Sequence, residues 1–143
     1  MKAKTSSKIK KISKLPLPKL QRQLWLVVRE LAEKFYPKDC YTCEAKNLIG
    51  HNCQLGHMIP KSVCGILLKY DIRQLRWQCS RCNIWGGGMG AEFVKRMTVR
   101  EGYDYVEKIF RDRNSFVKPY EHYLFQLEKY KLMLEDLNAV SKG

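Results

Sequence analysis

Cys40-Tyr41-Thr42-Cys43 and Cys79-Ser80-Arg81-Cys82 each hold two cysteines separated by two residues. This spacing lets both sulfurs of one pair face a single ion, and two pairs complete the tetrahedral shell of thiolates that zinc prefers. Such a shell contributes on the order of 10–16 kcal/mol in zinc-finger peptides, enough to fix a loop-rich segment. Four protein ligands leave no open coordination position. The pattern therefore predicts a structural zinc site formed by Cys40, Cys43, Cys79 and Cys82.

The other two cysteines, Cys53 and Cys64, and the nearby His51 are irregularly spaced, so we expect the cysteines to be buried or idle. The chain begins without an apolar stretch of signal-peptide length. It also lacks a run of about 18 apolar residues, the length of a membrane span. We therefore expect a cytoplasmic protein, where paired cysteines bind metal more readily than they form disulfides. A redox role for the cysteine pairs is the alternative.

The charge of the chain is strongly basic, with a formal net charge of +13 over 143 residues. No acidic residue precedes Glu30, and lysines crowd the segment 1–19, which we expect to be a flexible basic arm. A chain of this charge suits a polyanionic partner, because each phosphate that it neutralises releases counterions. The composition thus favours a nucleic acid as the partner.

Helical spacing of apolar residues predicts a helix over 19–35, ending before Pro37. Short strands are expected at Leu55–Pro60 and Ile72–Gln78, and a loop at the glycine-rich segment 85–90. Beyond it, 91–100 and 103–112 have helical patterns. A last helix opens at Lys118-Pro119, since proline is tolerated in a first turn. Its apolar stripe either packs on the rest of the fold or forms a dimer interface.

Two polar residues with catalytic potential are interleaved with the cysteine pairs. His57, in Gly56-His57-Met58-Ile59-Pro60, lies between them, and Asn83 follows the second pair directly. Histidine has a pKa near neutral pH and so suits the deprotonation of water. The amide oxygen of asparagine is a hard ligand that can hold hydrated Mg²⁺. If zinc locks the turn before Asn83, it also fixes the separation of the two side chains, so we expect both to act on one phosphodiester.

In this order, the Cys40/Cys43 pair, Gly56-His57, Asp71-Ile72-Arg73 and Gln78-Cys79, with Cys82-Asn83, resemble the HNH nucleases that have a zinc-bound ββα-metal fold. The chain is most similar to the phage NinG/Rap recombination endonucleases and more distantly to recombination endonuclease VII. The resemblance covers roughly 20–137. It implies an α+β fold with an N-terminal helix at 20–37, a zinc-stabilised ββα module at 38–100 and a C-terminal helical region at 101–143.

The same resemblance implies an endonuclease that uses Mg²⁺ or Mn²⁺ to cut branched recombination DNA, such as a Holliday junction or a D-loop. The products would carry 5′-phosphate and 3′-hydroxyl ends. His57 would be the general base and Asn83 the ligand of the catalytic metal. A homodimer and other phage recombination proteins are the implied partners.

This sequence departs from the nuclease pattern at two positions. Endonuclease VII-type proteins have an acidic metal ligand before the histidine, where this chain has Gly56, although NinG-like proteins tend to share the glycine. The middle asparagine, which steadies the loop that carries the histidine, is replaced by Gln74, which we assign to the catalytic group. Asp71 is a weaker substitute for the missing metal ligand and could instead pair with Arg73.

Basic residues near these motifs are the expected contacts of the DNA backbone, namely Lys61, Arg73, Arg76 and Arg81. Nothing in the chain resembles a base-reading recognition helix, which favours selectivity for shape over sequence. Two other functions stay open. One is a non-catalytic zinc-containing DNA-binding protein, and the other is a phage protein that binds a host complex through its C-terminal helices.

Overall fold

The computed structural model describes residues 15–142, and most of the predicted basic arm at 1–19 lies outside the described residues. The first described helix, α2 (Leu17–Phe35), begins two residues earlier than predicted. It buries Leu20, Leu24, Val28 and Leu31, which share one face because they are three or four residues apart. The chain leaves the helix at Tyr36, whose extended backbone is the conformation that a following proline favours.

Two short strands form the only sheet within residues 15–142, an antiparallel pair of β1 (Gln54–His57) and β2 (Leu75–Gln78). The register places Gln54 opposite Gln78, and His57 opposite Leu75. Because side chains alternate between the two faces, Trp77 points to the α2 side, where its indole nitrogen donates to the carbonyl oxygen of Ala32 at 3.3 Å. Gly56 and Gln78 lie on the opposite face.

Both strands are shorter than the sequence predicts. The first ends at His57, before the Met58–Pro60 segment that we assigned to it. The second begins only at Leu75, because Ile72–Gln74 form a 3₁₀ turn, η2. The carboxylate of Asp71 accepts a hydrogen bond from the backbone N–H of Arg73 at 3.0 Å and caps this turn.

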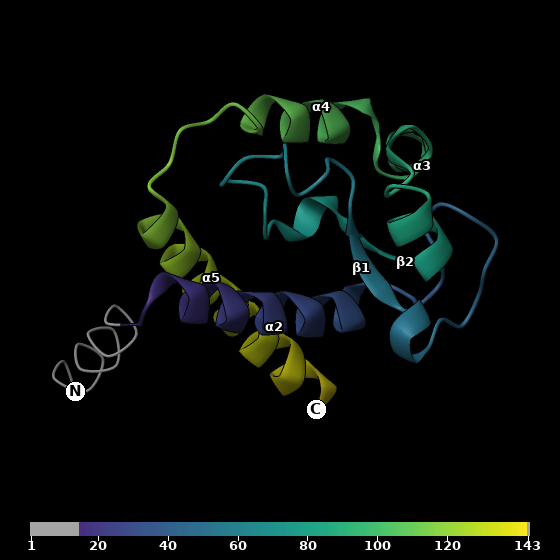
Figure 1. Ribbon diagram of the computed structural model, residues 1–143. Helices are drawn as coiled ribbons and strands as arrows, with labels where there is room; N and C mark the ends of the chain where they lie inside the picture. Colours follow the sequence, from purple (N-terminus) through teal and green to yellow (C-terminus); the bar gives the residue numbers. More distant parts are fainter. Residues whose placement is uncertain (1–14, 143) are drawn as a thin grey trace, which may run out of the picture.

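The remaining elements are helical. A short 3₁₀ turn, η1 (Gly50–Asn52), precedes β1, and a π-helical turn, η3 (Arg81–Trp85), follows β2. The sequence predicted neither turn. The predicted helices are confirmed as α3 (Gly90–Glu101), α4 (Tyr103–Asp112) and α5 (Pro119–Ser141). Figure 1 shows α2 beside α5, while α3 and α4 lie across the sheet from them.

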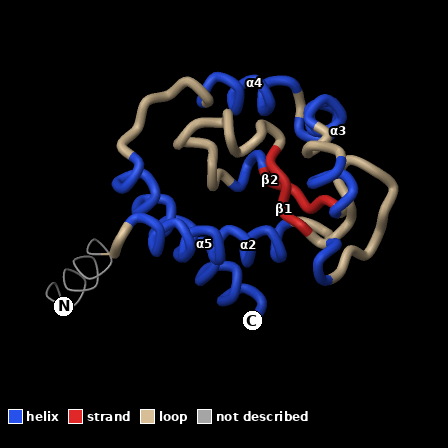
Figure 2. The backbone as a smooth tube through the Cα atoms, viewed as in Figure 1, coloured by secondary structure: helices blue, strands red, loops and turns tan. Residues whose placement is uncertain are grey.

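Two groups of buried apolar side chains hold these elements together. The larger lies between α2, the sheet and α5, and includes Leu24, Trp77 and Leu127. The smaller joins the loop after β1 to α3 and α4 through Met58, Phe93 and Ile109. The fold is therefore mixed, with helices around a small two-stranded sheet, as Figure 2 shows. The predicted N-terminal and C-terminal helical flanks share one core with the cysteine-rich segment.

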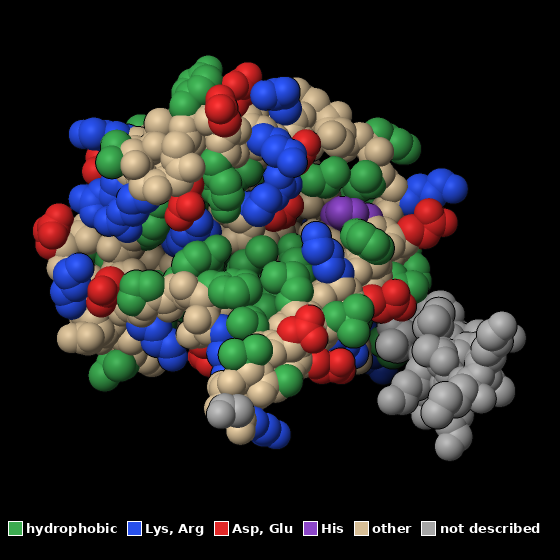
Figure 3. All heavy atoms as spheres, turned by 180° about the vertical axis from the view of Figure 1, so that it is seen from behind, with side chains coloured by type: hydrophobic (Ala, Val, Ile, Leu, Met, Phe, Trp, Pro, Cys, Tyr) green, Lys and Arg blue, Asp and Glu red, His purple; other side chains and the backbone are tan. Residues whose placement is uncertain are grey.

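The surface carries charges of both signs. Figure 3 shows the face behind that of Figure 1, where Lys and Arg side chains are interspersed with Asp and Glu around a central hydrophobic group. None of the helices within residues 15–142 combines the length and the apolar character that a membrane span requires.

Candidate functional site

The four cysteines of the two C-x2-C pairs come together. The sulfur atoms of Cys40, Cys43, Cys79 and Cys82, here called the thiol cluster, all lie within 4.8 Å of one another. The Cys43 and Cys79 sulfurs are 3.7 Å apart. Four thiolates at the zinc–sulfur distance of about 2.3 Å in a tetrahedron are separated by about 3.8 Å. The cluster could therefore hold a metal ion such as zinc.

Backbone contacts position this cluster at the end of the sheet. The first pair is tied to β2 by a hydrogen bond from Tyr41 N–H to the carbonyl oxygen of Trp77, at 2.9 Å. Within that pair, the N–H of Ala45 donates to the Cys43 sulfur at 3.4 Å. Burial raises the pKa of the Cys82 thiol to about 12, and the neighbouring thiols act in the same direction. In Cys40 burial is outweighed by hydrogen bonds with the backbones of Cys79 and Thr42, which lower the pKa of its thiol to about 6. A bound cation would stabilise the thiolate form of all four cysteines.

The two other cysteines, Cys53 and Cys64, are buried in different core groups. Cys53 belongs to the larger core group and Cys64 to the smaller one. All six cysteines are free, and His51 is exposed in η1. Cys53 and Cys64 are both buried, as the sequence led us to expect.

His57 ends β1, and only one of its ring nitrogens has a hydrogen-bond partner among residues 15–142. Its Nε2 lies 2.8 Å from the carbonyl oxygen of Lys69. A carbonyl oxygen only accepts, so Nε2 carries the proton and Nδ1 keeps its lone pair. The ring stacks on Trp25, with centroids 5.9 Å apart and planes 6° from parallel. Burial lowers the pKa of His57, and the positive charges of Lys61 and Lys69 act in the same direction. The site thus holds a neutral imidazole in a fixed orientation.

Asn83 lies in η3, one residue beyond the thiol cluster. Its backbone N–H donates to the carbonyl oxygen of Cys79 at 3.0 Å, so the second cysteine pair positions it directly. Its side-chain amide donates to Gln54 Oε1 at 2.8 Å. Asn83 and His57 line the same hollow of about 330 Å³. This His57 hollow is lined by Trp25, Leu55, His57, Pro60, Lys61, Asn83, Gly87 and Gly88.

Gly56 and Gln78 form a close contact beside Asn83 that the sequence analysis missed. A Cβ atom on Gly56 would lie 1.8 Å from Gln78 Oε1 and 3.1 Å from Asn83 Oδ1. The carboxamide of Gln78 thus fills the space that any side chain at position 56 would need. Glycine at a strand position can signal such a close approach.

Gln74 is fully buried and does not line the His57 hollow. Its Oε1 accepts from the N–H of Ile59 at 2.9 Å, and its Nε2 donates to the carbonyl oxygen of Leu68 at 2.8 Å. These bonds join the two ends of the loop that follows His57. Gln74 therefore acts as a positioning residue that steadies this loop, and the prediction that it belongs to the catalytic group needs this correction.

The four predicted DNA-contact residues divide into two kinds. Lys61 is exposed and lines the His57 hollow, and Arg81 is exposed beside Cys82. Arg73 instead bonds Asp71 and Asp112 at 2.7 and 2.8 Å. The pairing with Asp71 that the sequence suggested is present, and it takes that carboxylate away from the role of a substitute metal ligand.

Arg76 is the second correction, because its side chain is only 4% exposed. Its guanidinium donates to the carbonyl oxygen of Leu75 at 2.8 Å and lies 4.0 Å from the ring centroid of Tyr36. The buried side chain of Arg76 packs against its neighbours and is not exposed to contact a phosphate. The prediction that Arg76 contacts DNA is therefore wrong.

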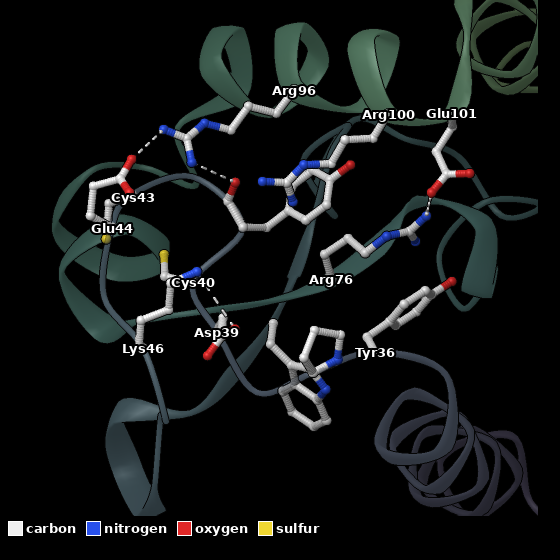
Figure 4. Close-up of a pocket in the computed structure, with 13 residues that line it drawn as sticks. Tyr36, Asp39, Cys40, Cys43, Glu44, Lys46, Arg76, Arg96, Arg100 and Glu101 are labelled. Carbon is white, nitrogen blue, oxygen red and sulfur yellow. Dashed lines mark hydrogen bonds and ion pairs between the residues drawn. The ribbon is translucent and has the colours of Figure 1, made fainter.

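A larger hollow of about 390 Å³ has Cys40 and Cys43 in its wall (Figure 4). Its arginines are engaged with neighbours. Arg76 pairs with Glu101 at 3.4 Å, Arg96 pairs with Glu44 at 3.6 Å, and Arg100 lies 4.5 Å from the ring centroid of Tyr41. Its lining contains no histidine, and its carboxylates Asp39, Glu44 and Glu101 pair with Lys46, Arg96 and Arg76. Its size alone therefore does not make it the better catalytic site.

Comparison with known proteins finds no family model, no curated protein and no solved structure that matches this chain.

Proposed function

We propose that the protein is a metal-dependent DNA endonuclease that cuts branched recombination DNA. The observation that carries the proposal is the hollow that His57 and Asn83 both line, with Asn83 directly following Cys82 of the thiol cluster. A base of suitable pKa and a hard oxygen ligand in one site are what phosphodiester hydrolysis requires.

His57 would act as the general base. Its Nδ1 takes a proton from water, and the resulting hydroxide oxygen forms a bond to the phosphorus. The bond from phosphorus to the 3′ oxygen breaks, and this oxygen takes a proton from solvent. The ends are then a 5′-phosphate and a 3′-hydroxyl. The Lys69 carbonyl and the Trp25 ring hold the imidazole in place during the transfer.

Asn83 would hold Mg²⁺ or Mn²⁺ through Oδ1, which suits a hard cation. The bound cation would supply Lewis-acid stabilisation of the charge on the leaving oxygen. The thiol cluster has a different task. With zinc bound by four thiolates no coordination position stays open, so the zinc would be structural and would keep Asn83 close to His57.

DNA would be held by positive charge. The net charge of +13 favours sequence-independent binding, and Lys61 places one exposed ammonium at the His57 hollow. The preference for branched DNA rests on the resemblance to recombination endonucleases. A pair of sites in a homodimer would cut two strands of one junction.

A cleavage assay with four-way junction and linear duplex, with and without Mg²⁺, tests this function. We expect Mg²⁺-dependent cutting that is faster on the junction. His57→Ala and Asn83→Ala abolish it while zinc content and DNA binding stay unchanged. His51→Ala is the matched control, since His51 is exposed and outside the His57 hollow. Full activity of His57→Ala would contradict the assigned base.

The absence of a side chain at Gly56 favours a second function, that of a zinc-containing protein that binds DNA without cutting it. Binding of the junction without cleavage in Mg²⁺ or Mn²⁺ would support this alternative. If the protein neither binds nor cuts DNA at low salt, a protein-interaction role gains support. Helix α5 leaves Phe125 and Leu132 about three-fifths exposed, at 62% and 60%, as a contact surface for such a role.

A further inference from the structure

The side chain of Gln78 contains a buried oxygen without a hydrogen-bond donor. Gln78 is 0% exposed, and its Oε1 has no partner among the described residues. Buried acceptors of this kind are rare in native proteins and indicate a missing donor, water or cation. The oxygen faces the strand position of Gly56.

Hydrogen bonds fix which way this carboxamide points. Gln78 Nε2 donates to the carbonyl oxygen of Gly88 and to Thr42 Oγ1, both at 2.9 Å. Rotating the amide by half a turn would bring its oxygen against the Gly88 carbonyl, and two acceptors repel. Oε1 must therefore face Gly56.

The carboxamide of Asn83 is fixed by the same reasoning. Gln54 Nε2 donates to the carbonyl oxygen of His51 at 3.0 Å, which leaves Gln54 Oε1 as an acceptor. Asn83 Nδ2 donates to that oxygen at 2.8 Å, so Asn83 Oδ1 points the other way. Both oxygens lie near the position that a Cβ on Gly56 would take, at 1.8 Å for Gln78 and 3.1 Å for Asn83.

We propose that Gln78 Oε1 and Asn83 Oδ1 together bind the divalent cation of the site, Mg²⁺ or Mn²⁺. This assignment rests on the proposed nuclease function and deepens it, since it supplies a second protein ligand. Hard cations are bound by neutral amide oxygens as well as by carboxylates. A water molecule that donates to both oxygens is the other occupant that this geometry admits. Because both ligands are neutral, a DNA phosphate would add the negative charge, so metal and DNA should strengthen each other's binding.

Mn²⁺ titration of the zinc-loaded full chain, followed by NMR, separates a cation from a water. A bound Mn²⁺ broadens the side-chain NH₂ signals of its ligands. We expect the signals of Gln78 and Asn83 to disappear together at the lowest Mn²⁺ concentration, and excess Mg²⁺ to restore them. The buried carboxamide of Gln74 is the matched control. If the Gln78 signal persists until the signals of exposed groups broaden, the oxygen binds water and the assignment is wrong.

Two substitutions at Gln78 give a second test. If Gln78 is a metal ligand, they change the affinity for Mn²⁺ in opposite directions, and if it is purely structural, they do not. Gln78→Glu keeps an oxygen in place and adds a charge, so it should tighten Mn²⁺ binding about tenfold, as ligand charge does in other sites. Gln78→Leu should abolish the binding. Both variants lose the hydrogen bond to the Gly88 carbonyl. A purely structural Gln78 would therefore make them equally defective, and that result would overturn the proposal.

A double variant guards against misfolding of the single ones. In Gly56→Asp/Gln78→Ala, the carboxylate at position 56 enters the space that Gln78 Oε1 leaves. We expect Mn²⁺ binding to be lost in Gln78→Ala and regained in the double variant, with zinc content constant. Failure to regain it in a folded, zinc-loaded double variant would count against the assignment.

These measurements are independent of DNA cleavage. If Mn²⁺ binds through Gln78 and Asn83 but no DNA is cut, the metal site stands and the nuclease function fails. If the protein cuts DNA while Mn²⁺ leaves both signals unchanged, the function stands and the ligand assignment fails.

Discussion

The substitution Gly56→Ala tests the close packing of the sheet against Gln78. The new Cβ would lie 1.8 Å from Gln78 Oε1, far inside contact distance, so the carboxamide has to move. Moving it breaks the hydrogen bonds of Nε2 to Gly88 and Thr42. Two such bonds contribute about 0.5–1.5 kcal/mol each, and the overpacking adds about 1–3 kcal/mol. We expect a loss of about 2–6 kcal/mol in the free energy of unfolding.

Urea unfolding of the zinc-loaded protein measures this loss, and a double-mutant cycle identifies its cause. Gln78→Ala removes the group that the new methyl strikes, so Gly56→Ala should cost at least about 1 kcal/mol less in that background. Gly90→Ala is the control, because a Cβ there meets nothing within 4 Å. It should be neutral or slightly stabilising. Additive costs of the two substitutions would refute the proposed contact.

Four further outcomes are expected. Gln74→Leu leaves the Ile59 N–H buried without a partner and removes one of two hydrogen bonds of the Leu68 carbonyl, which keeps that from the Asp71 N–H. It should lower the free energy of unfolding in urea by about 1.5–4.5 kcal/mol, and a loss below about 1 kcal/mol would contradict the role of Gln74 in steadying the loop. Burial lowers the pKa of His57, so the unfolded chain binds more protons than the folded one, and stability falls as the pH drops below about 6.5. Between pH 7.5 and 5.5 (about one unit either side of that value), the free energy of unfolding of His57→Gln should fall less than that of the wild type. Cys43→Ser should lose zinc, measured by elemental analysis, and unfold more readily, whereas Cys53→Ser keeps its zinc. Lys61→Ala should weaken DNA binding for all sequences and reduce the slope of the logarithm of the binding constant against the logarithm of salt concentration by about one. Lys131→Ala, at an exposed position on α5, is the control. An unchanged slope in Lys61→Ala would contradict a contact between Lys61 and DNA.

Local sequence patterns predicted the elements whose structure depends on local contacts. The spacing of Leu20, Leu24, Val28 and Leu31 specifies one buried face of a helix, and α2 has this face. The spacing within each cysteine pair likewise predicted the thiol cluster. Residues close in the chain determine the helix face and the geometry of each cysteine pair, whereas the approach of Cys43 to Cys79 depends on the fold.

Two local turns without a periodic signal, and one burial that depends on a distant contact, were predicted less well. The apolar Ile72 suggested a strand, but the Asp71 carboxylate caps a turn there. The π-helical turn at Arg81–Trp85 has no periodic signal, and a bond from Gly86 N–H to the Arg81 carbonyl at 2.7 Å accompanies it. Arg76 was expected on the surface, yet it is buried against Tyr36, which precedes it by many residues.

The candidate site was predicted only in part, because some of its contacts depend on how the strands pair. His57 and Asn83 are near the cysteine pairs in sequence, and they line one hollow. Gln78 was noted only as a residue beside Cys79. Its contact with Gly56 depends on the register of β1 and β2, which pairs Gln54 with Gln78, and that register is set by tertiary packing.

The single-turnover rate of phosphodiester cleavage tests the assignment of His57 most directly. The substrate is an end-labelled four-way junction, and the enzyme is the zinc-loaded protein with Mg²⁺. Wild type and His51→Ala should cut at the same rate and leave 5′-phosphate ends. His57→Ala should be slower by at least about 10²-fold, the contribution of a general base, with its zinc retained. Equal rates for His57→Ala and wild type would contradict the account.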